Sequence, residues 1–331
     1  MNNKTLPLLL LVISFSLMFS PEMNAAEDED AIDTDHERMI LYKEMDGITH
    51  VPWYWLAAID AHERGLNVAR NDRDEQEGLI DIYYSPREWV GALNPDLEDN
   101  DAARISMFGG VGLDGDDDGE ANRQKDRDVL YTMARQISTY GYDDENIRIA
   151  LWEHYQRDQA VRIISGHANL FKEYGTIALE ETAFPVPLEY NYTYHSTWGD
   201  TRGWGGRRIH EGTDIFAGHS TPVRATKYGV VELKGWNTYG GWRIGIRDPE
   251  NVYHYYAHLS SFADGIEEGS IVEPGMEIGK VGSSGYGKPG TEGKFPPHLH
   301  YGLYRDNGYS EWSFDPYPSL NSWETKERQQ G

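Results

Sequence analysis

Cysteine is absent from the 331-residue sequence, and basic residues are scarce in it. Without cysteine the chain has no disulfide bond, no thiolate metal site and no cysteine nucleophile. Lysine and arginine together number 30, against 55 aspartate and glutamate residues, which gives a formal net charge of −25 at pH 7. Such an acidic surface repels phosphate backbones and anionic membranes, so nucleic acid is excluded as a partner.

The N-terminal apolar run, residues 6–19, is shorter than the roughly 20 residues that a membrane-spanning helix needs. It follows Lys4 and precedes the small residues Ala25 and Ala26, which is the pattern of a secretory signal peptide. The residues just before these alanines are not the small ones that a cleavage site favours, so an uncleaved membrane anchor is the alternative. We expect residues 1–26 to be one or the other, and the chain to be secreted or anchored on the cell-wall side. A secreted chain without disulfide bonds fits the exterior of a Gram-positive bacterium.

Glycine and aromatic residues are, by contrast, abundant. The chain has 35 glycines, 22 tyrosines and 10 tryptophans, and its share of glycine exceeds the usual value of about 7%. This composition indicates turn-rich β structure and clefts lined by aromatic side chains. At roughly 100–200 residues per domain, the length of the chain favours two domains.

The spacing of apolar residues changes part-way along the chain and predicts an α+β fold with two domains. Residues 27–182 are expected to form an all-α domain, because apolar residues recur there every three or four positions. The helices predicted within it cover residues 36–46, 51–64, 126–140, 144–156 and 159–171. Residues 183–194, which contain two prolines, are expected to be a stiff linker. Short strands separated by glycines predict a β domain over residues 195–318, followed by a loose polar tail at 319–331.

Two short segments of the second domain contain residues of the types that bind metals. His210 and Asp214 lie four residues apart, but Gly212 between them disfavours a helix, so we expect a loop that leads into a strand. His298 and His300 lie two apart in a predicted strand and therefore share one face of it. Alone, either segment is more often a pair of surface residues than a set of ligands.

Together the two segments offer imidazole nitrogens and one carboxylate, which are the usual ligands of a catalytic zinc ion. Such a site keeps a fourth position for water, which hydrolysis requires. A third segment, residues 255–260, stands between them and contains His258. His254 precedes His258 by four residues and would share its face in an unbroken strand. We nevertheless expect His254 to be exposed, with a supporting position at the site as the alternative.

At this point the sequence resembles the lysostaphin-type zinc metalloendopeptidases, which cut the peptides of bacterial peptidoglycan. The similarity runs from residue 198 to residue 304 and includes, in order, the segments HEGTDI, YYAHLS, VEPGMEIG, GSSG and PHLHYG. The resemblance implies that one Zn²⁺ ion per chain is held by His210, Asp214 and His300. It also implies that His258 and His298 are catalytic histidines that do not bind the metal. The fold that it implies is an antiparallel sheet built from duplicated hybrid-type hairpins.

The first domain resembles lytic transglycosylases and other lysozyme-like proteins in one segment. Residues 51–65, VPWYWLAAIDAHERG, are similar to the helix that carries the catalytic glutamate of those enzymes, and Glu63 falls at its position. The neighbouring Arg64 replaces a usual serine and would lower the pKa of the carboxyl group, whereas a general acid for glycosides needs a raised pKa. A glycan-binding relic, a second active site and a helical spacer are therefore the alternatives for this domain.

An acidic loop precedes the helix predicted at 126–140. Asp114, Asp116 and Asp118 alternate in the stretch GLDGDDDGEAN, and their oxygens could bind Ca²⁺. Lys125 stands where a hand-type calcium loop has its bidentate glutamate, so a solvated acidic turn is the alternative.

The pairing of a lysozyme-like region with this peptidase behind a signal segment is similar to the sporulation-associated endopeptidases of endospore-forming bacteria. That resemblance implies hydrolysis of the L-Ala–D-Glu bond in the stem peptides of spore-cortex peptidoglycan. An endopeptidase for peptidoglycan cross-bridges and a wall-binding or activator module without catalysis are the alternatives. Peptidoglycan is the expected partner in each case, and contact with a membrane is expected only through an uncleaved N-terminal segment.

Overall fold

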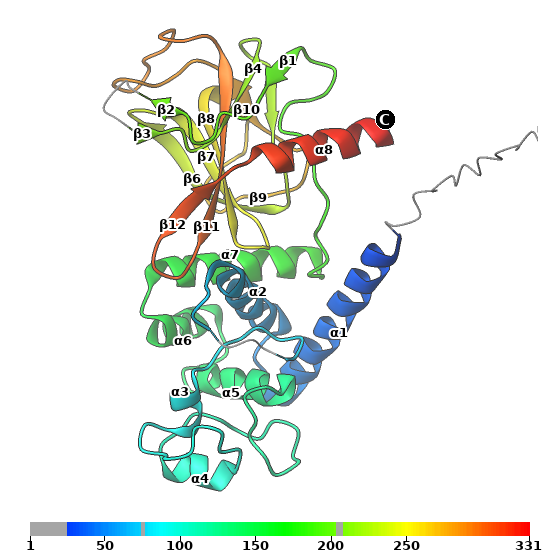
Figure 1. Ribbon diagram of the computed structural model, residues 1–331, viewed down its shortest axis with the longest axis vertical. Coiled ribbons are helices and arrows are strands. Elements are labelled where there is room, and N and C mark those ends of the chain that lie inside the picture. Colours follow the sequence, from blue (N-terminus) through cyan, green and yellow to red (C-terminus); the bar gives the residue numbers. More distant parts are fainter. Residues whose placement is uncertain (1–24, 74–76, 203–207) are drawn as a thin grey trace, which may run out of the picture.

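Figure 1 shows a computed structural model of the chain, which describes residues 25–331 except 74–76 and 203–207, with side chains from residue 34 onward. The expected signal segment lies outside the described residues, apart from its last two positions. Within the described ranges, no helix is both long and apolar enough to cross a membrane.

The first part of the chain is helical, as predicted. Its helices are α1 (Ala25–Thr49), α2 (Trp53–Ala69), α3 (Pro86–Val90), α4 (Ala102–Met107), α5 (Asp126–Ser138), α6 (Asp144–Tyr155) and α7 (Asp158–Tyr174). The last three and α2 lie where the spacing of apolar residues predicts helices. The helix predicted at 36–46 lies in the second half of the longer α1, and the short helices α3 and α4 were not predicted.

Local sequence sets where these helices begin and end. The Asp143 carboxylate accepts a hydrogen bond from the backbone N–H of Asn146 and so caps the start of α6. Gly175 ends α7 in the left-handed conformation, with a φ of 69°, which glycine adopts at little cost. Between its ends, α7 packs its apolar face against α2, and this pair forms the centre of the helical core.

The second part of the chain is an antiparallel sheet, which confirms the predicted fold class. Its strands are β1 (Tyr192–Tyr194), β4 (Thr213–Ala217), β5 (Pro222–Arg224), β6 (Gly229–Asn237), β7 (Gly241–Arg247), β8 (Val252–Phe262), β9 (Ile271–Val272), β10 (Glu277–Val281), β11 (His298–Asp306) and β12 (Glu311–Phe314). The main strand order is β1-β4-β11-β8-β7-β6-β9, with β12 beside β11 and with β10 beside β8 and β5. The strands β2 (Thr201–Arg202) and β3 (Arg208–Ile209) form a separate two-stranded ribbon.

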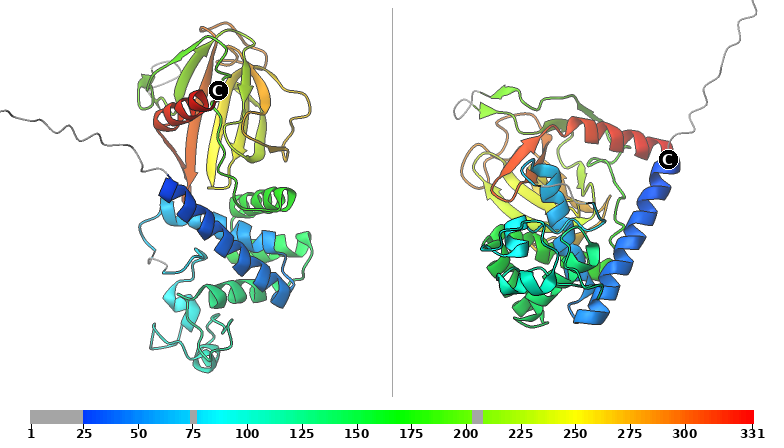
Figure 2. Two further views of the ribbon diagram at one scale, coloured as in Figure 1. Left: turned by 90° about the vertical axis from the view of Figure 1, so that its right-hand side faces the viewer. Right: turned by 60° about the horizontal axis from the view of Figure 1, so that its bottom comes forward.

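Each part has its own hydrophobic core, and both apolar contacts, through Val230 of β6, and polar contacts join the two parts. α7 packs against β6 and α2 packs against β11, so these two helices lie between the sheet and the rest of the helical part (Figures 1 and 2). The Arg157 guanidinium donates to both carboxylate oxygens of Asp306, at 2.6 and 2.8 Å. The Nε2 atom of His167 on α7 lies 2.8 Å from the backbone oxygen of Asp248, which follows β7.

The expected linker is part of the folded sheet region. Phe184 and Val186 are fully buried in its hydrophobic core. Residues 192–194 form β1, which pairs with β4. The prolines therefore hold a packed segment rather than one that connects two bodies through solvent.

The C-terminal residues form a helix, so the expectation of a loose tail from residue 319 is wrong. This helix, α8 (Tyr317–Gln330), lies alongside the sheet (Figure 2). Its residue Leu320 is fully buried. The Glu324 carboxylate accepts hydrogen bonds of 2.6 Å from the hydroxyls of Tyr192 and Tyr194. These contacts hold α8 against β1.

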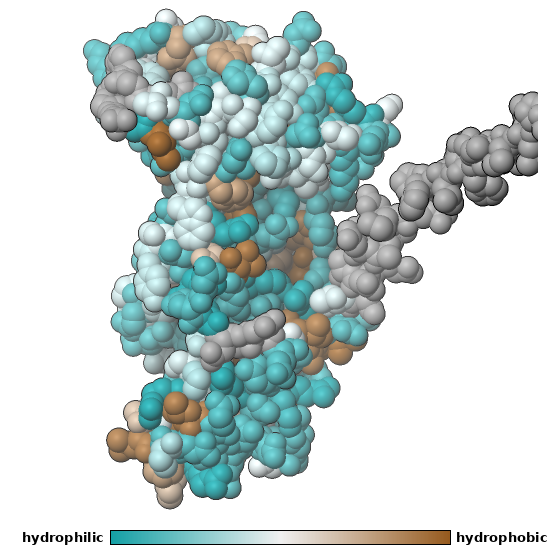
Figure 3. All heavy atoms as spheres, in the orientation of Figure 1, coloured by the Kyte–Doolittle hydropathy of each residue, from teal (hydrophilic) through white to brown (hydrophobic). Residues whose placement is uncertain are grey.

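The face of the molecule drawn in Figure 3 is mainly hydrophilic, in keeping with the net charge of −25. Hydrophobic residues on this face gather where the helical and sheet parts meet. Elsewhere on it they occur singly or in small groups, as is usual for a protein surface.

Candidate functional site

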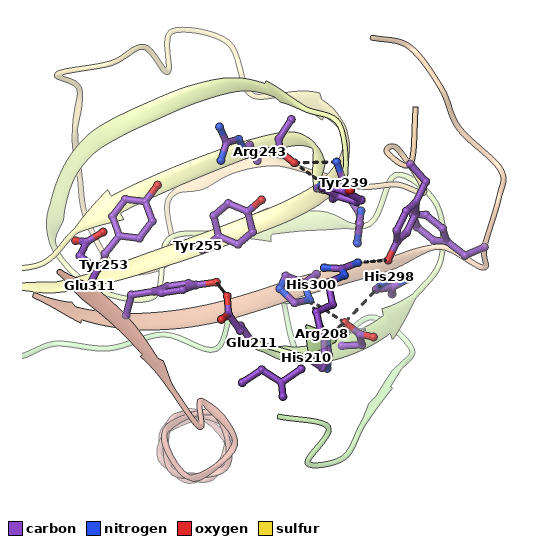
Figure 4. A pocket seen from close by; sticks show the side chains of 18 residues that line it. Arg208, His210, Glu211, Tyr239, Arg243, Tyr253, Tyr255, His298, His300 and Glu311 are labelled. Atoms are coloured by element: carbon purple, nitrogen blue, oxygen red, sulfur yellow. Dashed lines mark hydrogen bonds and ion pairs between the residues drawn. The ribbon is translucent and has the colours of Figure 1, made fainter. Parts of the chain in front are cut away.

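A groove of about 730 Å³ lies on the sheet and carries the residues that the sequence motifs mark. Its walls come from β3, β4, β6, β7, β8, β11 and β12 and from loops between strands. All the predicted metal and catalytic residues of the second domain line it: His210, Asp214, His258, His298 and His300. Figure 4 shows His298 and His300 towards one end of the groove and Tyr253 and Glu311 at the other.

Three of these residues direct one polar atom each at a common centre. The Nε2 atom of His210 lies 2.9 Å from His300 Nδ1 and 3.0 Å from Asp214 Oδ1. His300 Nδ1 lies 3.1 Å from the same Asp214 oxygen. Ligand atoms bound at about 2.1 Å to a tetrahedral metal ion are about 3.4 Å apart, so the triangle is close to the spacing of a ligand set.

The surroundings of the two histidines fit a cation at this centre. His210 Nδ1 lies 2.9 Å from the backbone oxygen of Thr197. Because a carbonyl oxygen only accepts, Nδ1 carries the proton and Nε2 presents its lone pair to the centre. Burial lowers the pKa of His300, so this imidazole is also neutral near pH 7. Two imidazole lone pairs and a carboxylate that face one another form a metal site.

The register of neighbouring strands brings these ligands together. His300 on β11 pairs with Asp214 on β4 and with Ala257 on β8. Gly212 lies against the His300 ring, and a Cβ atom at this position would be 2.7 and 2.8 Å from two of the ring atoms. The glycine of the His-x-Gly-x-Asp segment is therefore required by the packing of His300.

His258 and His298 lie beside the triangle and are held in the same way as each other. Each directs Nδ1 at a backbone oxygen 2.8 Å away, that of Ser284 for His258 and that of Pro296 for His298. Nε2 is therefore the nitrogen through which each ring exchanges a proton. The two ring centroids are 4.8 Å apart. Burial is the main cause that lowers the pKa of His258 well below its ordinary value, and the charges of His298 and His300 add to it.

The backbone of His258 explains which histidines of β8 face the groove. Its φ is 64°, an uncommon conformation for a residue with a Cβ atom, and strain of this kind gathers at functional sites. The register between β7 and β8 shifts at this point. Because the alternation of faces is interrupted, His258 joins Tyr253 and Tyr255 in the groove.

His254 lies in the interior of the protein, so the expectation that it is exposed is wrong. Only 2% of its surface is accessible. Its Nδ1 atom lies 2.7 Å from the Tyr301 hydroxyl, and its Nε2 atom lies 2.9 Å from Asp248 Oδ2. The interrupted alternation of β8 separates it from the face of His258.

Aromatic and basic residues, most of them outside the motifs, form much of the rest of the groove. Five tyrosines line it: Tyr239, Tyr253, Tyr255, Tyr286 and Tyr304. The Arg208 guanidinium lies 5.0 and 6.0 Å from the ring centroids of Tyr239 and Tyr286, and Arg243 lies near Tyr255. The high tyrosine content predicts an aromatic-lined cleft, but composition alone does not place its residues.

Glu63 lies inside the helical region and is only 2% exposed. Its carboxylate accepts a hydrogen bond of 2.6 Å from Arg73. Arg64 pairs instead with Asp60, at 3.3 Å, because neighbouring residues of a helix point to different sides. The cation beside Glu63 is therefore Arg73 and not the expected Arg64. A catalytic or glycan-binding role of Glu63 stays a prediction.

The acidic loop does bring its three aspartates together. One carboxylate oxygen each of Asp114, Asp116 and Asp118 lies within 4.8 Å of the others. Asp114 accepts two hydrogen bonds from backbone N–H groups of the loop, and the Lys125 ammonium group pairs with Asp118. The loop thus supplies a cation of its own, and the Ca²⁺ site stays a prediction.

Comparison with known proteins places the chain in a family. The sequence model of peptidase family M23 matches residues 208–312, which contain the whole set of groove histidines and Asp214. The chain is also 54% identical over 320 residues to an L-Ala–D-Glu endopeptidase of Bacillus subtilis, a match that covers 97% of this chain and 98% of that protein. The chain belongs to peptidase family M23.

Lysostaphin-type proteins match a shorter part of this M23 peptidase. Lysostaphin of Staphylococcus staphylolyticus is 34% identical over 116 residues, which cover 34% of this chain and 22% of lysostaphin. The solved catalytic domain of lysostaphin from Staphylococcus simulans is 30% identical and matches with a TM-score of 0.32 over 40% of this chain and 92% of that domain. The family match and the sequence identity to lysostaphin confirm the predicted resemblance to a lysostaphin-type metallopeptidase.

Proposed function

We propose that this M23 peptidase is a zinc-dependent endopeptidase that hydrolyses the L-Ala–D-Glu bond in peptidoglycan stem peptides. The proposal of metal-dependent hydrolysis rests on the triangle of ligand atoms from His210, Asp214 and His300. The choice of bond is supported by the B. subtilis L-Ala–D-Glu endopeptidase, which matches along almost the whole chain, whereas the match to lysostaphin covers about a third of it. Such an enzyme acts outside the cytoplasm, in the spore cortex on this proposal.

His210, Asp214 and His300 would hold the zinc ion. Two imidazole nitrogens and one carboxylate are a donor set of catalytic zinc sites, which leave a further position for water. When bound, the ion supplies a Lewis acid that polarises the scissile carbonyl group and makes water more acidic. The Thr197 carbonyl keeps His210 in the correct tautomer and orientation.

His258 and His298 would transfer the protons of the reaction. Hydrolysis of a peptide bond requires that a proton leave the attacking water and that another reach the departing amine. Both imidazoles have Nδ1 tied to a backbone oxygen, so both exchange protons at Nε2. With ring centroids 4.8 Å apart, the two histidines can act on the same peptide bond, one as acceptor and the other as donor.

The test is digestion of three defined substrates by the zinc-loaded full chain, with the products identified by mass spectrometry. The substrates are a stem peptide that contains L-Ala–D-Glu, a D-alanine cross-linked peptide dimer and a pentaglycine peptide. We expect one cut, at the amide between L-Ala and D-Glu. Cleavage of the cross-link or of pentaglycine alone would identify a cross-bridge enzyme. No cleavage of any substrate would support a wall-binding module.

A further inference from the structure

Arg243 is a groove residue that neither the ligand set nor the histidine pair uses. It lies on β7 and lines the groove, half-buried, whereas the next residue, Ile244, is fully buried in the hydrophobic core. Figure 4 shows it above the β8 tyrosines. Its guanidinium carbon lies 5.9 Å from the centroid of the Tyr255 ring. A permanent positive charge is thus built into the wall of the groove.

The charge of Arg243 is not neutralised within the described part of the chain. Its Nε atom is buried and has no hydrogen-bond partner there. No carboxylate of the described residues forms an ion pair with it, whereas Arg247, four residues further along β7, pairs with both Glu232 and Glu311. A buried donor without an acceptor costs free energy. Nε itself is closed to a ligand, so an anionic group bound in the groove would be held by the Nη groups at the end of the Arg243 side chain.

Arg243 is close enough to the metal site to contact a residue next to the scissile bond. Its strand, β7, is separated from β11 only by β8, and two strand spacings amount to about 10 Å. Tyr255 bridges this interval, because its ring centroid lies 5.9 Å from that of His300. A bound peptide extends about 3.5 Å per residue, so adjoining residues of one substrate reach both places.

We propose that Arg243 determines specificity by binding the free carboxylate of the glutamyl residue next to the cleaved bond. This inference rests on the function proposed above. A glutamyl residue has two carboxyl groups, and only one of them continues the peptide chain, so the other remains as an anion. A guanidinium group binds a carboxylate through two parallel hydrogen bonds. Bonds between glycines offer no such anion.

The second basic residue of the groove is a less suitable partner for this carboxylate. The Arg208 guanidinium already donates to the Tyr286 hydroxyl at 3.1 Å and lies against two tyrosine rings. It is exposed, so water competes for its remaining donors. Arg208 therefore serves as the matched control in the test.

The test compares two synthetic peptides that contain L-Ala–D-Glu. In one the free carboxyl group of the glutamyl residue is intact, and in the other it is a carboxamide. The wild-type protein is expected to cleave the acid with a kcat/KM about 10- to 100-fold higher, the size of effect that a charge-assisted hydrogen bond gives. Arg243→Gln should remove this preference through a loss on the acid alone, while zinc content stays unchanged. Arg243→Lys should restore part of it, and Arg208→Gln should change both rates alike.

Equal wild-type rates on the two peptides would overturn the role of Arg243 without affecting the proposed function. The same conclusion would follow if Arg243→Gln lowered the rate of cleavage of both peptides equally, since that result indicates a structural role. If the wild-type protein cut neither peptide between L-Ala and D-Glu, the proposed function itself would fail, and the inference with it.

Discussion

His298 and His300 lie two residues apart on β11, yet their surroundings assign them different tasks. His300 Nδ1 is part of the ligand triangle, at 3.1 Å from Asp214 Oδ1. His298 Nε2 lies 3.7 Å from the same oxygen, and its ring packs near His258. We therefore propose that removing one affects metal binding and that removing the other affects the chemistry.

The first prediction separates these two tasks. His300→Ala should lose both zinc and activity, because only two of the three protein ligands would remain to hold the ion. His298→Ala should retain about one zinc ion per chain and lose about 10²- to 10⁴-fold in kcat, the usual contribution of a positioned acid or base. Zinc analysis and single-turnover kinetics on the same preparations measure both quantities. Loss of zinc from His298→Ala would reverse the assignment.

Sequence motifs predict the ligand set well, because each ligand lies in a short segment with characteristic neighbours. They do not predict the position of His254, because one left-handed residue, His258, changes the face on which the earlier part of β8 lies. Nor do they mark Arg243, because the importance of this residue depends on the lack of an ion-pair partner among the described residues. Only the folded chain determines that no carboxylate among the described residues pairs with this guanidinium and that its Nε atom has no acceptor.

Among the elements, α8 shows how tertiary contacts create structure that local sequence does not indicate. Its residues are largely polar, and the start of the helix lacks a side-chain cap. It is held instead by partners more than a hundred residues earlier: Glu324 by two tyrosines of β1, and Glu327 by Arg224 of β5 at 2.8 Å. The core helices α5 and α7 were predictable because their apolar spacing is a local property.

The second prediction tests the docking of α8. Leu320→Ala should lower the free energy of unfolding by about 2–5 kcal/mol, because Leu320 is fully buried and its removal leaves a cavity. Urea unfolding of the full chain measures the change. Ser322→Ala, at an exposed position on the same helix, should have an effect within about 0.5 kcal/mol. Identical stability of Leu320→Ala and the wild type would indicate a loose tail.

At the scale of the whole molecule, the helical part and the sheet part meet through apolar contacts of Val230 and through buried polar groups. His167 is fully buried at this junction, and its Nδ1 atom has no partner among the described residues. Burial is the main cause that lowers the pKa of His167 to about 4. The hydrogen bond to Asp248 and its charge act in the opposite direction, while the charges of Arg247 and Arg64 add to the lowering.

The third prediction follows from this lowered pKa. In the unfolded chain His167 binds a proton below about pH 6.5, whereas in the folded chain it stays neutral until about pH 4. The unfolded state therefore holds more protons between these values, and the stability falls as the pH decreases through this window, by about 3 kcal/mol. His167→Gln should unfold in urea with a shallower dependence on pH. An unchanged dependence would show that His167 does not contribute.

The fourth prediction concerns the net charge of −25. Cell walls that carry teichoic acids are anionic, so they repel an acidic enzyme, and salt screens this repulsion over about 10 Å at 0.1 M. Moderate salt should therefore speed the digestion of intact walls and leave the rate on soluble muropeptides nearly constant. Rates on both substrates across a range of ionic strength, at fixed pH and zinc concentration, measure the effect. The same salt response on both would contradict the electrostatic explanation.

The most direct test of the account is to measure zinc content and L-Ala–D-Glu hydrolysis on the same samples of the full chain. The wild-type protein should contain one zinc ion per chain, lose hydrolysis on chelation and regain it when zinc is added. His210→Ala should lack both zinc and hydrolysis, because it removes one ligand of the triangle. Hydrolysis at the wild-type rate by the chelated protein or by His210→Ala would contradict the central claim.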